Sequence, residues 1–274
     1  MFDLIAVFND TSKHCCSDPV LMRSIENTKK GQFITESSSD LPEPPSEHRF
    51  KNKADIIISP KRTFQAAQAH KGKKTCVLNF ANSTHPGGGV RNGARAQEEC
   101  LCRCSTLYFA LTDDMPIEKF YHRHRNMMNR RQMDSTYNDD CIYSPDITVF
   151  KTDTPSPRFI ENEAERYNVD VITCAAPNLH PFYGSANIGM DRLSEIHKIR
   201  ARHILDTARS QKTDVMILGA FGCGAFKNPP EVVAEASNEV IRDYLYDFET
   251  IEFAIVCSDG KPSWNYEVFS KTIK

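Results

Sequence analysis

The chain has 274 residues, of which 40% are hydrophobic and 26% charged, so it is long enough for one large domain or two small ones with a packed core. Its net charge of −2 gives no general attraction to nucleic acid or acidic membranes, so any affinity for a polyanion must come from a local patch. The longest nearly uncharged run, 215–226, is too short and too rich in glycine to span a bilayer, and the start MFDLIAVFND lacks the basic leader of a secretory signal. We therefore expect a cytoplasmic protein without membrane contact, although delivery by a specialised secretion system would leave no trace in this sequence.

The first fifty residues are expected to form an N-terminal extension. It would contain one short helix at about 21–29, followed by a linker rich in serine and proline that includes Pro42, Pro44 and Pro45. Residues 51–274 would then form the main domain.

Apolar runs and amphipathic segments alternate through this main domain. Strands are expected at 56–58, 75–80 (TCVLNF), 169–176, 214–221 and 251–257, and helices at 63–70, at 190–210 and after Asn228, Pro229 and Pro230. Buried β-branched runs that alternate with helices predict an α/β fold around a mostly parallel sheet.

One segment, 112–140, interrupts this alternation. It contains YHRHRNMMNRRQ and is expected to be an irregular, locally basic insert. Two interpretations remain open: a solvated surface loop, or a flap that faces the phosphates of a ligand. His122 and His124 would point to opposite sides of an extended segment, so they do not suggest a metal site.

The ten cysteines predict neither disulfides nor zinc. No paired CxxC unit is present, and the alternating Cys100, Cys102 and Cys104 cannot share one face of a helix. Free and mostly buried thiols are typical of a cytosolic chain. We expect no metal and no cofactor.

Two glycine-rich loops follow predicted strands. THPGGGVRNGARAQEE comes after TCVLNF and leads into a helix expected to begin at about Ala94, and GAFGCGAFKNPP joins the strand at 214–221 to a helix. In a parallel sheet both loops lie at the carboxyl edge, and two loops with free amides suit a diphosphate. The second loop is not a P-loop, because Lys227 is not followed by Ser or Thr, and it comes too late in the chain for a Rossmann fingerprint.

Two adjacent glutamates, Glu98 and Glu99, follow the first of these loops. About one turn into a helix they would point about 100° apart, so only one could face a ligand. The alternative is a solvated helix face on which Glu99 pairs with Arg95 or Arg103 at four-residue spacing. Their position after an anion-binding loop favours a place beside the sugar of a bound nucleotide.

GGGVRNGARAQEE resembles the GGG…QEE signature of microbial-type poly(ADP-ribose) glycohydrolases, a branch of the macrodomain superfamily. VLNFANSTHPGGG, CAAPN (174–178), IYSPDITVF and LGAFGCGAFKNPP resemble further blocks of that family in the same order. The resemblance runs from about residue 22 to 257. It implies a three-layer α/β/α macrodomain that binds ADP-ribose and cleaves the glycosidic bond at its distal ribose. The partner implied is an ADP-ribosylated protein or nucleic acid, with ADP-ribose as the product.

The same resemblance implies roles for the two glutamates. Glu99 would be the catalytic acid/base, and Glu98 would orient the ribose beside it. Cleavage at an anomeric carbon passes through an oxocarbenium-like state and needs a proton donor for the leaving group. Glu99 must therefore carry a proton, which a partly desolvated pocket beside a second carboxylate favours.

The resemblance also implies a set of binding residues. Asn79 and Gln97 match polar positions near the distal ribose, Phe226 would pack on that ribose, and Asn82 is a candidate ribose ligand that departs from the small residue expected there. The first diphosphate loop would comprise Gly87, Gly88, Gly89 and Val90, and the second would comprise Gly222, Cys223, Gly224 and Ala225. The segment 112–140 has no clear counterpart in the family.

Three other functions remain as alternatives. A non-catalytic reader of ADP-ribose would bind without releasing product. A mono-ADP-ribosyl hydrolase would act on one protein or nucleic-acid linkage through the same pocket. A nucleic-acid-binding module built on HRHR and NRR is disfavoured by the acidic balance and by the scarcity of stacking aromatics.

Overall fold

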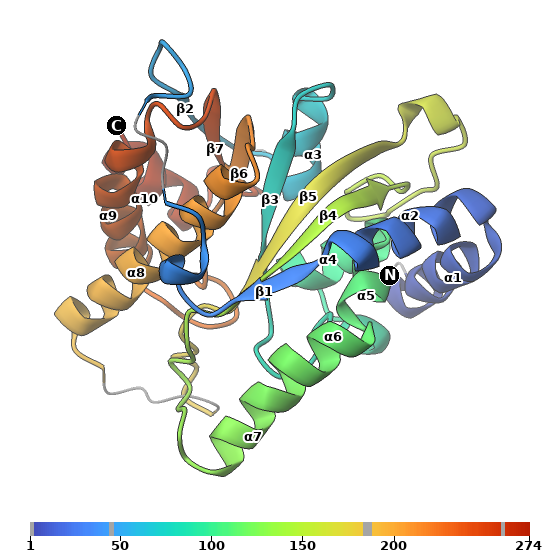
Figure 1. Cartoon of the computed structure of the whole chain (residues 1–274), viewed down its shortest axis with the longest axis horizontal. Helices are drawn as coiled ribbons and strands as arrows, with labels where there is room; N and C mark the ends of the chain where they lie inside the picture. The colour runs from blue at the N-terminus through green and yellow to red at the C-terminus, as the bar shows by residue number, and fades with distance from the viewer. Residues whose placement is uncertain (1–2, 44–46, 183–187, 259–260) are drawn as a thin grey trace.

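In the computed structural model, which describes residues 3–43, 47–182, 188–258 and 261–274, the chain is organised around a seven-stranded sheet (Figure 1). Its strands are β1 (Phe33–Thr35), β2 (Asp55–Ser59), β3 (Thr75–Phe80), β4 (Cys141–Val149), β5 (Tyr167–Cys174), β6 (Val215–Leu218) and β7 (Thr250–Ala254). They lie in the order β1-β4-β5-β3-β6-β7-β2. Strands β5, β3, β6, β7 and β2 run parallel to one another, whereas β4 runs antiparallel to β1 and β5. The expected mostly parallel sheet is confirmed.

Helices cover both faces of this sheet and complete a three-layer arrangement (Figure 1). One face carries α8 (Met190–Ser210), α9 (Pro230–Ile241) and α10 (Trp264–Thr272), and the other carries α1 (Leu4–Ser17), α3 (Thr63–Ala69), α4 (Gln97–Cys104) and α5 (Leu107–Leu111). Successive side chains of a strand point to opposite faces, so Leu78 belongs to the first core and Val77 to the second. Both faces of β3 are therefore buried.

The N-terminal fifty residues contain more structure than the single short helix that we expected. α1 is followed by α2 (Pro19–Gly31), and each helix begins where an aspartate side chain, Asp3 or Asp18, accepts backbone N–H groups. β1 then pairs with β4. Pro44 and Pro45 of the expected linker lie outside the described residues. The division of the chain at residue 50 stays a prediction.

The segment 112–140 is helical over more than half of its length, so the expectation of an irregular insert is wrong there. α6 (Asp114–Pro116), a π-helical turn (Ile117–His122) and α7 (Arg123–Asn129) follow one another as one rod (Figure 1). Phe120 and Tyr121 are fully buried in the core beneath this rod. Their burial supplies the apolar packing that stabilises these short helices.

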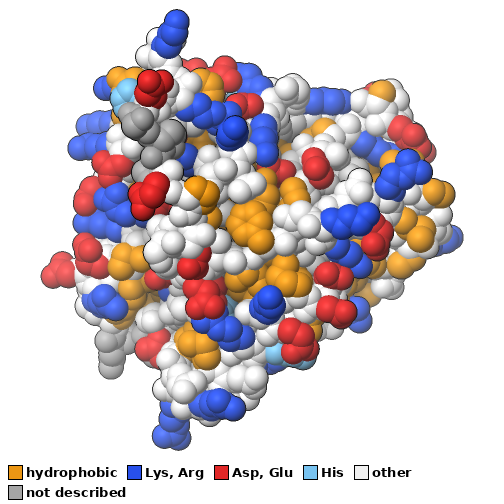
Figure 2. All heavy atoms as spheres, in the orientation of Figure 1, with side chains coloured by type: hydrophobic (Ala, Val, Ile, Leu, Met, Phe, Trp, Pro, Cys, Tyr) orange, Lys and Arg blue, Asp and Glu red, His pale blue; other side chains and the backbone are white. Residues whose placement is uncertain are grey.

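The distribution of surface charge and the state of the cysteines agree with the expectations from the sequence. Lys and Arg side chains alternate with Asp and Glu over the face shown in Figure 2, as a small net charge suggests. All ten cysteines are free, and six of them are buried. In the described part of the chain, no helix combines the length and apolar character that crossing a bilayer requires.

Candidate active site

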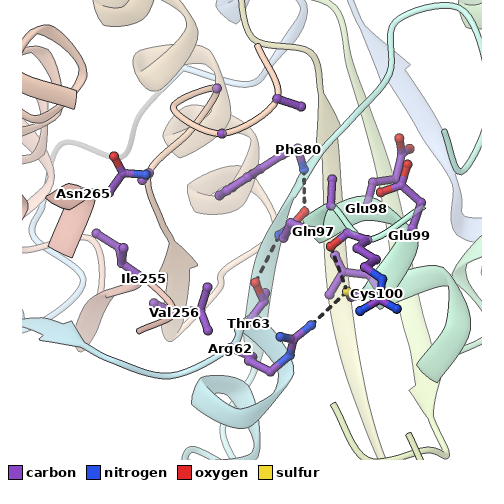
Figure 3. A pocket seen from close by; sticks show the side chains of 18 of the residues that line it. Arg62, Thr63, Phe80, Gln97, Glu98, Glu99, Cys100, Ile255, Val256 and Asn265 are labelled. Atoms are coloured by element: carbon purple, nitrogen blue, oxygen red, sulfur yellow. Dashed lines mark hydrogen bonds between the residues drawn. The ribbon is translucent and has the colours of Figure 1, made fainter. Parts of the chain in front are cut away.

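A pocket of about 530 Å³ lies at the carboxyl ends of the parallel strands, the edge where α/β proteins bind ligands. Its volume is in the range of small-molecule sites, roughly 300–1,000 Å³. In Figure 3, Glu98 and Glu99 lie at one end of it, and Ile255, Val256 and Asn265 lie at the other. The pocket therefore has an acidic end and a mainly apolar end.

Both glutamates are buried in the first turn of α4 and both line the pocket. The helix begins at Gln97 instead of about Ala94, because the backbone is extended at Ala96, with a ψ of 176°, after a short 3₁₀ turn and the left-handed Gly93 with a φ of 73°. Our expectation that only one glutamate could face a ligand is wrong. The side chains come from the very start of the helix and converge on the glycine loop.

The Glu98 carboxyl is held by two donors. Its Oε2 accepts a hydrogen bond from the backbone N–H of Asn82 at 2.8 Å, and its Oε1 accepts one from Asn79 Nδ2 at 3.3 Å. Glu98 is only 2% exposed. Burial raises the pKa of Glu98 to about 8, and the nearby Glu99 carboxyl acts in the same direction, against the hydrogen bonds from Asn82, Asn79 and the Gly87 backbone, which lower it. At neutral pH the Glu98 carboxyl therefore carries a proton.

The Glu99 carboxyl has one satisfied and one unsatisfied oxygen. Oε1 accepts a hydrogen bond from the backbone N–H of Gly89 at 2.9 Å, whereas Oε2 is buried without a partner among the described residues. A buried carboxyl oxygen without a partner is rare and costs free energy. No described ion pair joins Glu99 to Arg95 or Arg103, and the Arg103 guanidinium instead donates to Ala94 O and to Cys100 Sγ. The solvated-face interpretation of Glu99 is thus not what the structure shows.

The Gly88 backbone lies directly against the carboxyl groups of Glu98 and Glu99. A Cβ atom at this position would lie 2.5 Å from Glu99 Oε1 and 3.1 Å from Glu98 Oε2, and the residue adopts a φ of 54°. Only glycine allows the backbone to pass this close to the acidic end of the pocket.

The sequence resemblance implies release of ADP-ribose, and we expect Gly88→Ala to lower that rate by roughly tenfold or more, because the added methyl group must displace the Glu99 carboxyl. The matched control is Gly72→Ala, where φ is 99° but no atom lies within 4 Å of the added methyl. Both variants should lose about 1–2 kcal/mol of stability in denaturant titrations from the left-handed backbone. Only Gly88→Ala should lose activity, and equal activity of the two variants would contradict the packing argument.

Gln97 fastens the start of α4 to the sheet. Its side-chain oxygen accepts from the backbone N–H of Phe80 at 2.9 Å, and its Nε2 donates to Leu78 O at 2.7 Å and to Thr63 Oγ1 at 3.1 Å (Figure 3). These bonds engage both ends of the amide. Gln97 lines the pocket, and its amide groups are already used in holding the helix.

The second loop is held open by Asn228. Asn228 Nδ2 donates to Gly222 O at 3.1 Å and to Pro177 O at 2.7 Å. Gly222 has a φ of 78°, and a Cβ there would lie 2.6 Å from Ala176. Gly222, Gly224 and Ala225 of this loop line the pocket, as Gly88 does.

The structure brings most of the expected site residues to the pocket. Its lining includes Asn82, Gly88, Gln97, Glu98, Glu99, Gly222, Gly224, Ala225 and Phe226. The remaining five do not line it and lie behind it or within the loops: Asn79, Gly87, Gly89, Val90 and Cys223. Asn79 supports Glu98, Gly89 supports Glu99, Gly87 lies against Tyr108, and Val90 and Cys223 pack with the two cores.

Sequence reasoning missed the pocket-lining residues that lie outside the two glycine-rich loops. Lys61, Arg62 and Thr63 follow β2, and Ile255 and Val256 follow β7, and all five line the pocket. The rule that ligands bind where parallel strands end could have found these positions, because both strands were expected.

A charged cluster completes the wall near α4. Arg62 Nε donates to Asp153 Oδ1 at 2.6 Å, and its guanidinium also donates to Cys100 Sγ at 2.8 Å (Figure 3). Among the described residues, no group of three or more His, Cys, Asp or Glu side chains is arranged to hold a metal ion.

Comparison with known proteins identifies the family. The family model for the catalytic domain of microbial-type PARG, poly(ADP-ribose) glycohydrolase, matches residues 16–152, which is half of the chain. This chain belongs to that family. Enzymes of this family hydrolyse glycosidic bonds in poly(ADP-ribose), and the chain is an ADP-ribosyl glycohydrolase with a macrodomain-like fold. No curated protein sequence matches it.

Solved structures of bacterial PARG proteins resemble the whole chain. The poly(ADP-ribose) glycohydrolase of Thermomonospora curvata is 26% identical with a TM-score of 0.82, covering 98% of this chain and 99% of that one. The same enzyme bound to the inhibitor ADP-HPD is 28% identical with a TM-score of 0.81 and 98% coverage of both chains. The Deinococcus radiodurans enzyme in complex with ADP-ribose is 30% identical with a TM-score of 0.72, covering 90% of this chain and 96% of that one.

Proposed function

We propose that this PARG-family enzyme binds the ADP-ribose unit of an ADP-ribosylated protein or nucleic acid in the pocket, and that Glu99 is its general acid/base. The observation that carries the proposal is the Glu99 side chain, which lines the pocket beside Gly88 with its Oε1 held by the backbone N–H of Gly89. The D. radiodurans relative, solved with ADP-ribose, supports the choice of ligand.

The two ends of the pocket suit the two ends of ADP-ribose. The base would lie against Ile255 and Val256, with the Asn265 side chain available at its edge. The diphosphate would lie between Gly88 and the second glycine loop, where backbone amides favour anions. The distal ribose would then pack on Phe226 and face Glu98 and Glu99.

Asn82 suits the ribose hydroxyls. Its backbone N–H holds Glu98, and its Oδ1 accepts from the backbone N–H groups of Thr84 at 2.9 Å and His85 at 3.0 Å. Among the described residues no hydrogen bond uses its Nδ2, and the residue lines the pocket. This amide is therefore a donor available to a sugar oxygen.

The reaction breaks the bond between the anomeric carbon of the distal ribose and the leaving oxygen. Glu99 transfers its proton to that oxygen as the bond breaks, and positive charge develops on the ring. The ligand's own diphosphate lies close enough in this arrangement to stabilise that charge. A water molecule then adds to the anomeric carbon, and Glu99 takes up its proton. The protonated Glu98 donates a hydrogen bond to a ribose hydroxyl and fixes the ring.

A parallel release assay tests the function. Polymer, protein mono-modified through acidic, serine or arginine linkages, and ADP-ribosylated DNA would be offered to the enzyme, with free ADP-ribose measured over time. Release from at least one substrate is expected, and the preferred substrate identifies the linkage. Tight ADP-ribose binding without release from any of them would instead support a reader.

The compartment is part of the same proposal. Ten free cysteines, six of them buried, favour a reducing compartment such as the cytoplasm.

A further inference from the structure

We propose that His124, in the helix α7, is a positioning residue for this reaction, which holds the turn after β3 and thereby the Glu98 carboxyl. The proposal rests on the function proposed above. It gives the segment 112–140, which lies within the residues matched by the family model, a place in the active-site framework.

His124 links α7 to the turn through a buried network. Its Nε2 lies 2.7 Å from Asp140 Oδ2, and its Nδ1 lies 2.9 Å from Ser83 Oγ. All three residues are at most 2% exposed. Nδ1 also lies 3.0 Å from the carbonyl oxygen of Ser83, so the ring contacts both polar groups of Ser83 while Nε2 faces the Asp140 carboxylate. Arg123 also pairs with Asp140 and completes the charge balance.

This Ser–His–Asp arrangement is not a second hydrolase site. Ser83 is fully buried and does not line the pocket, so no substrate carbonyl can reach its hydroxyl. Its groups instead satisfy one another inside the protein. A fully satisfied buried network of this kind gives the surrounding backbone one defined arrangement.

One peptide bond, between Asn82 and Ser83, connects this network to the residue that binds Glu98. Ser83 directly follows Asn82, whose backbone N–H donates to Glu98 Oε2 at 2.8 Å. A second contact from the same helix, Arg125 Nη1 to Thr84 O at 2.5 Å, holds the other side of the turn. Two consecutive residues of α7, His124 and Arg125, therefore form hydrogen bonds with two consecutive residues of the turn, Ser83 and Thr84.

The turn needs this external support because it has no regular structure of its own. It leaves β3 after Phe80, and the chain from 81 to 89 forms neither strand nor α-helix. The π-helical turn before α7 sets the rotation of that helix about its axis, and π-helical turns are often found at functional sites. A loosened turn would let the Asn82 N–H, and with it the Glu98 carboxyl, move away from the ribose.

The test compares His124→Gln and Ser83→Ala with His122→Gln. His122 is the matched control, because it lies two residues earlier and its side chain is 43% exposed beside Glu118. We expect kcat to fall by roughly 10- to 100-fold in the two test variants, with KM and ADP-ribose affinity within about threefold of wild type. The control should keep wild-type kcat. Rates are measured at a temperature where circular dichroism shows every variant folded, so lost stability does not contribute.

A double-mutant cycle separates positioning from a general structural role. If Ser83 acts through Glu98, adding Ser83→Ala to Glu98→Gln should lower single-turnover release by less than about twofold. Independent, multiplying effects would overturn the proposal, as would wild-type kcat in His124→Gln. Should His124→Gln fail to fold, Ser83→Ala alone decides, since it removes only one hydroxyl.

Glu99→Gln in the same series keeps this inference apart from the proposed function. If Glu99→Gln is inactive while Ser83→Ala and His124→Gln keep wild-type activity, only the proposed positioning role of α7 is refuted. An active Glu99→Gln would refute the proposed function itself.

Discussion

Glu99→Gln is expected to lower the rate of ADP-ribose release by roughly 10²- to 10⁴-fold, the usual contribution of a general acid or base. Glutamine keeps the shape of the side chain, and its amide oxygen can still accept the hydrogen bond from the Gly89 N–H. The proton that the leaving oxygen needs is then missing. Release is followed by chromatography under single-turnover conditions, and ADP-ribose affinity is measured by calorimetry.

Affinity for ADP-ribose should change by less than about threefold in Glu99→Gln, since the proposed binding mode uses the backbone loops and the apolar end of the pocket. The matched control is Glu235→Gln, an exposed glutamate on α9 that should behave as wild type. Near-normal turnover of Glu99→Gln would show that Glu99 is not the general acid/base. Loss of both binding and turnover would make Glu99 a structural residue.

As the pH rises from 4.5 to 8, the free energy of unfolding of Glu98→Gln is expected to increase relative to that of the wild type. The folded protein keeps a proton on Glu98 up to about pH 8, whereas the unfolded chain releases it near 4.5. The wild type therefore loses stability across this window, and an uncharged glutamine does not. The relative gain should reach roughly 3 kcal/mol by pH 7 and disappear below pH 4.5.

Urea titrations of both proteins at pH 4, 5.5, 7 and 8 measure this difference. A gain of that size corresponds to a rise in Tm of roughly 5 °C or more at pH 7. Glu235→Gln again serves as the control and should follow the wild type at every pH. Parallel stability curves for Glu98→Gln and wild type would mean that Glu98 is already ionised in the folded protein.

Elements with a strong and regular pattern could be predicted closely from the sequence. The bounds of β3 and α8 agree with expectation, because TCVLNF is a continuous buried run and 190–210 keeps one apolar face over 21 residues. The start of α4 could not be placed in the same way. Ala94, Arg95 and Ala96 suit a helix by type, yet they lie outside it, and Ala96 is its extended N-cap.

The acidic and glycine-rich part of the site could be predicted because its chemistry is unusual. Paired glutamates after three glycines are conspicuous in any sequence, whereas Ile255 and Val256 look like the rest of a core strand. Their role follows only from where β7 ends. The helices within 112–140 were missed for a related reason, since their stability comes from burying Phe120 and Tyr121 against distant parts of the chain.

β1 has a practical consequence for anyone who shortens this protein. It covers the outer edge of β4, while Phe8 of α1 contacts Tyr108, and Thr11 of α1 donates to the backbone oxygen of Arg103 in α4, the helix that carries Glu99. Recombinant fragments that start near residue 50 would leave the N–H and C=O groups of β4 free to pair with other molecules, which invites aggregation during expression. Versions for crystallisation or screening should retain the chain from Asp3 onward.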